Sequence, residues 1–150
     1  MQDFNDILQP FDFIVELLND NKADLGLRYV AENDDELIPE YPAVLVQCDN
    51  TERERHATQI YRVVFHLDLW VFHAGLSDSI AVRSRKDIEL ATAIRKLLHS
   101  KSSLDGHIVQ AFVDGEFPGI TARVIGGDPT AIVTTRLTWQ GENRVRYEDS

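Results

Sequence analysis

The chain has 150 residues, a formal net charge of −10, 43% hydrophobic residues and one cysteine, Cys48. This length suits a single domain with its own core, and one cysteine excludes an intrachain disulfide and is typical of synthesis in a reducing cytoplasm. No apolar run approaches the roughly 18 residues of a transmembrane helix, and the first residues lack the basic start and apolar run of a signal peptide, so we expect no membrane association.

The negative charge is concentrated near the amino terminus. Residues 1–40 hold eleven Asp or Glu against two basic residues, a net of −9, whereas residues 41–150 have a net of −1. A protein that grips nucleic acid normally carries a basic stripe, so this distribution argues against that class and is most simply a source of solubility. Within one domain spanning residues 1–150 we distinguish an acidic helix and connection (1–40), a core of sheet and helix (41–140) and a carboxy-terminal tail (141–150).

The first expected element is a helix at about residues 6–18, where apolar residues recur at helical spacing. Pro10 lies inside this apolar stripe. Because proline has no N–H to donate and its ring clashes with the preceding turn, the helix is either kinked at Pro10 or begins near it. The acidic residues 20–42 then form a connection that includes a short strand or extended piece at Tyr29 and Val30.

The most informative stretch is 61–72, whose odd positions are all apolar and whose even positions are mixed. Twelve residues of period-two alternation predict one long strand, roughly 40 Å at about 3.3 Å per residue. A preceding strand is expected at 43–48, and the charged residues 49–55 are expected to form the tip of the hairpin. The apolar face of the long strand should pack on helices. The other face carries Arg62, Val64, His66, Asp68, Trp70 and Phe72.

This mixed face is too polar for a core and too aromatic for ordinary solvent exposure. A surface that combines Trp70 and Phe72 with charged residues is typical of contact with another protein. The alternative is that loops of the chain itself cover the two aromatic side chains. Arg62, His66 and Asp68 on the same face could bind a metal or act as an acid and a base, although such a set is more often a surface pairing on a half-exposed sheet.

A second helix is expected at about residues 85–99. Ser84 is a good N-cap, and Asp87 three residues later can complete an arrangement like a capping box. Asp87 and Glu89 are expected on a solvated face that pairs with basic neighbours. Three strands follow, separated by turn-forming stretches at 114–119, 126–129 and 140–143: 107–113, 120–125 and 131–139, with 144–147 as a further edge strand or tail.

This order predicts an α+β fold, in which an antiparallel β-sheet of about four to five strands carries two α-helices packed on one face. The strand pairs are joined by turns too short for crossover helices, which favours antiparallel pairing. No catalytic, nucleotide-binding or metal-binding motif is present, so we expect no enzyme activity, no cofactor and no metal site. Cys48 is interpreted as a small apolar residue near a strand end.

One local basic cluster comprises Arg144 and Arg146, with Arg123 and Arg136 before them. A strand would place Arg144 and Arg146 on one side. They could touch phosphate, or they could meet the acidic amino-terminal region of an adjacent copy. The charge asymmetry of the chain favours the second interpretation, because an acidic and a basic patch on one subunit suit head-to-tail contacts, which close into rings or extend into filaments.

Several segments together resemble one family. The chain enters its first strand through Tyr41-Pro42-Ala43-Val44 and continues with an aromatic-rich strand containing His66 and Trp70. The second helix ends in Leu97-Leu98-His99, and the closing strand runs from Thr135-Arg136-Leu137-Thr138-Trp139 to Val145. In these segments, over roughly residues 4–147, the chain resembles the tail terminator (tail-completion) proteins of long-tailed bacteriophages.

The resemblance implies a small α+β subunit without catalytic activity, six copies of which form a ring on the head-proximal end of the tail tube. Such a ring stops tube polymerisation and joins the tail to the head connector. The implied partners are other copies of the chain, the tail tube protein and the head–tail connector or stopper, with DNA only passing through the lumen. The implied location is the virion tail or neck, after assembly in the host cytoplasm. Residues expected at contacts are Arg62, His66, Trp70, Phe72, Arg144, Arg146 and Tyr147.

Three alternatives remain open. The nearest is another neck or head–tail joining protein, which would differ in ring number and partner. A second is a small ligand-binding domain with a pocket between helices and sheet. The third is a metal-dependent hydrolase that uses His66 and Asp68.

Overall fold

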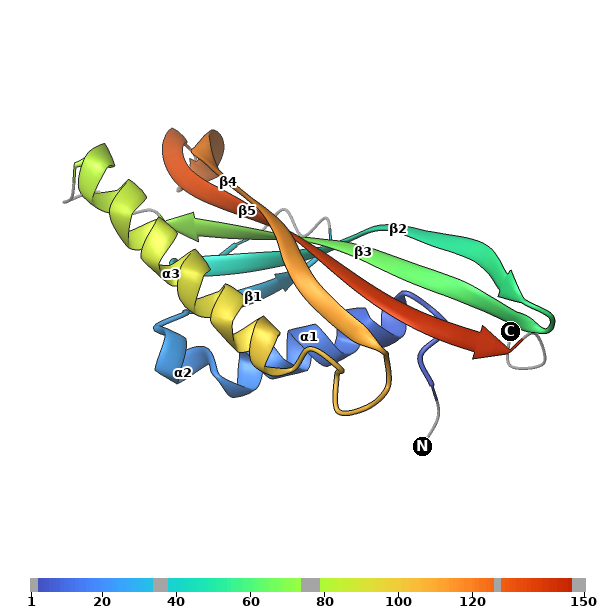
Figure 1. The fold of residues 1–150 in the computed structure, drawn as a ribbon. Helices are drawn as coiled ribbons and strands as arrows, with labels where there is room; N and C mark the ends of the chain where they lie inside the picture. Colours follow the sequence, from blue (N-terminus) through green and yellow to red (C-terminus); the bar gives the residue numbers. More distant parts are fainter. Residues whose placement is uncertain (1–2, 34–37, 74–78, 126–127, 147–150) are drawn as a thin grey trace.

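A computed structural model describes residues 3–33, 38–73, 79–125 and 128–146, with side chains except at 56 and 122–131 (Figure 1). The chain forms three helices and five strands within these residues. In chain order they are α1 (Leu8–Asp20), α2 (Lys22–Leu25), β1 (Tyr29–Glu32), β2 (Ala43–Ala57), β3 (Ile60–His73), α3 (Ile80–Ser100), β4 (Gln110–Ile125) and β5 (Asp128–Arg146).

The five strands form one sheet in the order β1-β2-β3-β5-β4. All neighbours pair antiparallel except β1 and β2, which pair in parallel. The expected α+β class, with a mostly antiparallel sheet and helices on one face, is therefore confirmed. The expectation missed the short helix α2 and the parallel pairing of β1, because residues 22–32 are too few to show a clear period.

The main core lies between the helices and one face of the sheet. The odd-numbered residues of β3 from Tyr61 to Val71 are buried in this core together with residues of α1 and α3, as their alternation predicted. A smaller apolar cluster lies on the other face, near β1, where Ala31, Leu45, Phe72 and Ile132 are buried. Helices cover only part of the sheet, and the β2–β3 hairpin reaches past them (Figure 1).

Pro10 lies in the first turn of α1. Of the two interpretations of this proline, the one in which the helix begins near it is therefore correct. The first N–H groups of a helix have no partner within the helix, so a proline there forfeits no hydrogen bond. The Asp6 carboxylate accepts from the N–H of Leu8 at 2.8 Å, and the Gln9 side-chain oxygen accepts from the N–H groups of Asn5 and Asp6. Side chains thus accept hydrogen bonds from the first helical N–H and from two N–H groups just before the helix.

Residues 49–55 are not a hairpin tip, as expected from their charge, but the second half of β2. Ala57 pairs with Ile60, which leaves a two-residue turn at Thr58 and Gln59, and Gln59 has a φ of 66°. A positive φ is typical of such tight hairpins. Charged residues are compatible with this strand because they are exposed and some have partners on β3: Glu54 lies opposite Arg62, and Glu52 lies 3.4 Å from His66.

Helix α3 begins earlier than expected. Its N-cap is Ser79, whose hydroxyl accepts from the N–H of Val82 at 3.3 Å, and Ser84 lies inside the helix. Asp87 is not on a solvated face, since it is only 1% exposed. The expectation for Glu89 is confirmed: it is exposed and pairs with Arg85 at 3.5 Å.

The last two strands are longer than expected. Residues 114–119 belong to β4 and 140–143 to β5, so neither stretch is a turn, and residues 141–146 are not a tail. Glycine and proline are tolerated in β4 because it is an edge strand, and a register shift at Asp114 accommodates the irregular stretch. The expected turn at 126–129 lies mostly outside the described residues.

Candidate protein interface

One face of the sheet lies opposite the helices, and we call it the open face. It comprises the even-numbered residues of β3 and the residues that pair with them in β2 and β5, together with Phe112 and Phe117 of β4. The main core includes buried residues of α1 and α3. It lies on the side of the sheet that carries the odd-numbered residues of β3. The open face therefore carries the mixed set of β3 side chains that the sequence predicted.

An aromatic and cationic cluster occupies one end of the open face. The guanidinium carbon of Arg136 lies 5.5 Å from the ring centroid of Trp70 and 4.8 Å from that of Phe117. Phe117 is 51% exposed, and the indole N–H of Trp70 donates to the Gln47 side-chain oxygen at 3.0 Å. Rigid aromatic side chains with an arginine between them are the combination most enriched at protein contacts.

Phe72 lies at the same end but is only 3% exposed. It packs with Leu45 and Ile132, while Tyr41 lies against this cluster from the connection before β2. The alternative that the chain covers its own aromatic residues therefore describes Phe72, whereas Trp70 is half-buried. Phe112 and Phe117, which the sequence analysis did not single out, supply the exposed aromatic surface. Only the register of β4 on β5 shows that these two apolar residues lie at exposed positions of an edge strand.

Three acidic residues lie near the middle of the open face. Asp49 of β2 and Asp114 of β4 are the extra residues at two register shifts, and Asp68 lies on β3 between these strands. Burial raises the pKa of Asp68, and the carboxylates of Asp49 and Asp114 raise it further, while Arg136 and His66 oppose the rise. Thr138 donates to Asp114 at 2.5 Å. The centre of the face thus brings three acidic residues close enough for their charges to interact.

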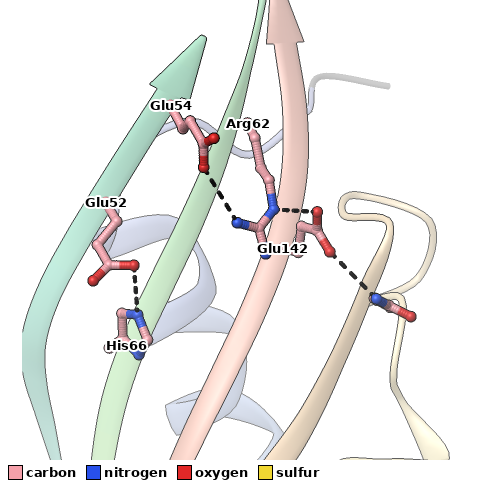
Figure 2. A network of polar contacts seen from close by, with 6 residues as sticks. Glu52, Glu54, Arg62, His66 and Glu142 are labelled. Carbon is pink, nitrogen blue, oxygen red and sulfur yellow. Dashed lines mark hydrogen bonds and ion pairs between the residues drawn. The ribbon is translucent and has the colours of Figure 1, made fainter. Parts of the chain in front are cut away.

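A ladder of charged pairs crosses the other end of the open face (Figure 2). Arg62 of β3 bridges two strands, with its Nε 2.5 Å from Glu142 of β5 and one terminal nitrogen 3.8 Å from Glu54 of β2. His66 Nε2 lies 3.4 Å from Glu52, and the Gln110 side-chain amide donates to Glu142 at 3.3 Å. Arg62 and His66 are thus engaged with carboxylates of neighbouring strands.

The ladder shifts the protonation of its central carboxylate. The hydrogen bond from Arg62 is the largest cause that lowers the pKa of Glu142, and the charges of Arg62 and Arg144 act in the same direction. The same hydrogen bond raises the pKa of Arg62. Both groups are therefore charged at neutral pH, and the ladder is a fixed pattern of alternating charge that a partner surface can read.

Arg144 and Arg146 lie on the same side of β5, as predicted, at the ladder end of the open face. Arg144 pairs in register with Arg62, and both Arg144 and Arg146 are exposed. Arg136 is eight residues from Arg144 along one strand, a separation of roughly 26 Å at about 3.3 Å per residue, so the two do not form one cluster. Tyr147 and the Arg123 side chain lie outside the described part of the chain.

A buried polar group on the helix face was missed by the sequence analysis. The Asp87 carboxylate accepts from Thr135 Oγ1 at 2.9 Å and lies 3.2 Å from His73 Nδ1. Burial raises the pKa of Asp87, while the contacts with His73 and Thr135 lower it. A signal existed, because Asp87 precedes Leu90, Ala91 and Ile94 at the spacing of the buried stripe. The group ties α3 to β3 and β5.

Two shallow hollows adjoin the helices. One, of about 320 Å³, lies between α2 and α3 and is lined by His73, Lys86 and Glu89 among others. The other, of about 240 Å³, lies between α1 and the turn after α3. Among the described residues, no group of three or more His, Cys, Asp or Glu has a geometry that would hold a metal ion, so His66 and Asp68 are not joined by a third such ligand there.

No protein-family model matches this sequence, and no curated protein matches it. None of the described helices is long and apolar enough to cross a lipid bilayer. A functional proposal therefore rests on the surfaces of the chain and on the sequence resemblance described above. Among these surfaces, the open face combines exposed aromatic residues, a central group of acidic residues and a fixed charge ladder, which are features of recognition by another protein.

Proposed function

We propose that this chain is a structural assembly subunit of a bacteriophage tail or neck, most specifically the tail terminator. In this role a ring of copies caps the head-proximal end of the tail tube, ends tube polymerisation and joins the tube to the head connector. The observation that carries the proposal is the open face, where Phe112 and Phe117 are exposed beside the Arg136 cluster. The resemblance described above supplies the identity of the assembly.

The open face suits a permanent contact rather than catalysis. Its charged groups pair with one another, and its exposed aromatic side chains provide apolar area that a partner can bury. The proposed partners are further copies of the chain, the tail tube protein and the head–tail connector, with DNA passing through the lumen. The proposed location is the virion, after assembly in the host cytoplasm.

The test combines assembly and capping. We expect light scattering after gel filtration to give a mass near six subunits, and added protein to stop the growth of purified tail tube protein into tubes. Replacing Arg144 and Arg146 by Glu should weaken ring formation or capping about tenfold or more, because charge reversal at a contact creates like-charge repulsion. Lys96→Glu, an exposed change on α3, serves as the matched control and should leave both readouts unchanged.

Two results would contradict the proposal. A protein that neither self-associates nor shortens tubes is not a tail terminator. A ring that forms but leaves tube growth unchanged would instead support another head–tail joining protein.

A second candidate, a small ligand-binding domain, is favoured by one observation: the hollow of about 320 Å³ between α2 and α3, beside the His73–Asp87 pair. A monomeric protein whose melting temperature rises with a small ligand, and falls back in His73→Ala, would support that candidate. We rank it second because the hollow is shallow and the open face offers a larger recognition surface.

A further inference from the structure

The first two turns of α3 touch no core. None of the residues 80–86 is buried, and the first buried residue of the helix is Asp87. Ile80 and Val82 are 46% and 45% exposed. Helices in proteins gain most of their stability by packing an apolar face. A helical segment whose branched apolar side chains are exposed is therefore a candidate surface for contact with a partner.

The same segment is basic. It contains Arg83, Arg85 and Lys86 and no acidic residue, and the Arg85 side chain is 85% exposed. Glu89, four residues after Arg85 on the exposed side of the helix, pairs with Arg85 at 3.5 Å. The segment therefore presents an apolar side chain flanked by positive charge, and a matching partner needs an apolar hollow with an acidic rim.

The chain carries such a hollow at the other end of α3. A cavity of about 240 Å³ lies between α1 and the turn that follows α3. Phe13 and Leu17, both partly buried, provide apolar lining, while Glu16, Asp20 and Asp105 provide acidic groups. Lys101 pairs with Asp105 at 3.2 Å, so Glu16 and Asp20 leave the rim negative.

The two surfaces cannot meet within one molecule. Helix α3 has 21 residues, a length of roughly 30 Å at about 1.5 Å per residue, and the segment and the hollow lie near its opposite ends. Figure 1 shows that α3 begins away from α1 and ends beside it. Complementary surfaces at opposite ends of one subunit make a head-to-tail contact, which closes into a ring if the rotation permits.

We propose that residues 80–86 of one copy seat in the hollow between α1 and the turn after α3 of the next copy. Val82 or Ile80 enters between Phe13 and Leu17, and Arg85 meets Glu16 and Asp20. This contact deepens the proposed function, because it names the surfaces that join the subunits of the ring. The opposite charges of α1 and the start of α3 select this pairing: α1 and α2 hold four acids and one base, whereas residues 80–86 hold three bases and no acid.

The experiment is disulfide crosslinking between copies in a Cys48→Ser background, which removes the natural thiol. Val82→Cys and Leu17→Cys proteins are oxidised separately and then as a mixture, alone and with tail tubes. We expect covalent dimers at least tenfold more abundant in the mixture than in either protein alone. The double variant should give a ladder of multimers that ends at the ring size. Val109→Cys, at a site 54% exposed that belongs neither to residues 80–86 nor to the lining of the hollow, replaces Val82→Cys as the matched control.

A charge exchange gives an independent readout. Arg85→Glu should weaken self-association about tenfold, and adding Asp20→Arg to the same chain should restore most of the loss, because every contact then regains a pair of opposite charges.

The outcomes separate the two proposals. Rings that cap tubes without the Val82–Leu17 crosslink would overturn this contact and leave the proposed function standing. Crosslinked ladders from a protein that does not stop tube growth would support the contact and overturn the tail-terminator role. A protein that stays monomeric both alone and on tubes overturns both.

Discussion

At the residue scale, Gly141 shows why a turn-forming residue lies in a central strand. It is buried on the helix face beside Trp139, and a Cβ placed there would overlap the indole ring. Gly141→Ala should therefore cost about 1–3 kcal/mol, the usual range for overpacking. Gly119→Ala is the matched control, because a Cβ there has no neighbour within 4 Å, and it should be neutral or slightly stabilising. Equal denaturant midpoints for the two variants would refute this account.

The Arg62–Glu142 pair gives a pH dependence with a defined sign. Arg62 lowers the pKa of folded Glu142, so the folded state binds this proton less readily than the unfolded state. The pair stabilises the fold above the ordinary glutamate pKa of about 4.3 and loses that contribution as the pH falls through the lowered value. Glu142→Gln should lower Tm by no more than about 3 °C at pH 7, since an ion pair at the protein surface contributes little.

The difference between wild type and Glu142→Gln should begin to shrink as the pH falls below about 4.3 and should vanish below the lowered pKa of Glu142. Glu54→Gln provides the comparison at pH 7, because Glu54 is 76% exposed and 3.8 Å from Arg62, and its effect should be smaller. A difference that grows on acidification would show that the pair does not lower the pKa of Glu142.

At the scale of elements, Asp87 fastens α3 to the sheet. Asp87→Ala should destabilise the fold by about 3–5 kcal/mol, because it leaves His73 and Thr135 without their shared acceptor. Asp87→Asn should cost less, since it keeps the volume and removes the charge whose burial raises the pKa. Glu89→Ala, on the exposed side of the same helix, should change stability by at most about 0.5 kcal/mol. Urea unfolding of the three variants gives the order, and a loss in Glu89→Ala as large as in Asp87→Ala would contradict this role.

The elements that the sequence predicted best were those with a strong period. The alternation of 61–72 gave β3 almost to the residue, and the apolar stripes gave α1 and most of α3. The errors fall where a local signal competes with pairing. Charges at 49–55 and glycines near 115 and 141 indicate turns in isolation, but cross-strand partners, an edge position and a neighbouring Trp139 make them strand residues.

The candidate site was predictable in outline only. The mixed face of β3 identified Arg62, His66 and Trp70 as surface residues, and their exposure agrees with this. Phe117 and Arg136 needed the register of β4 and β5, which no local pattern contains. Phe72 needed the second apolar cluster, whose members come from β1, β2 and β5.

At the scale of the whole molecule, charge and apolar exposure are divided between surfaces. The open face opposite the helices carries the aromatic cluster and the charge ladder, and the helix layer is acidic along α1 and basic along α3. A subunit built this way has one surface left for the tube or connector while its helix layer joins neighbouring copies. The two proposals thus use different surfaces: replacement of Arg144 and Arg146 by Glu tests the open face, and the Val82–Leu17 crosslink tests the helix layer.

The strand order also determines when the chain can fold. β5 is synthesised last, yet it lies between β3 and β4, and the Asn143 side chain closes the molecule by donating to the carbonyls of Phe4 and His107. Until residues 128–146 leave the ribosome, the nascent chain holds β3 with one edge unpaired, and β4 has no partner. Such an edge is a template for pairing with other chains. Because β5 is the last of the five strands to be synthesised and lies inside the sheet, the sheet closes only after residues 128–146 have emerged, and β3 exposes an unpaired edge until then.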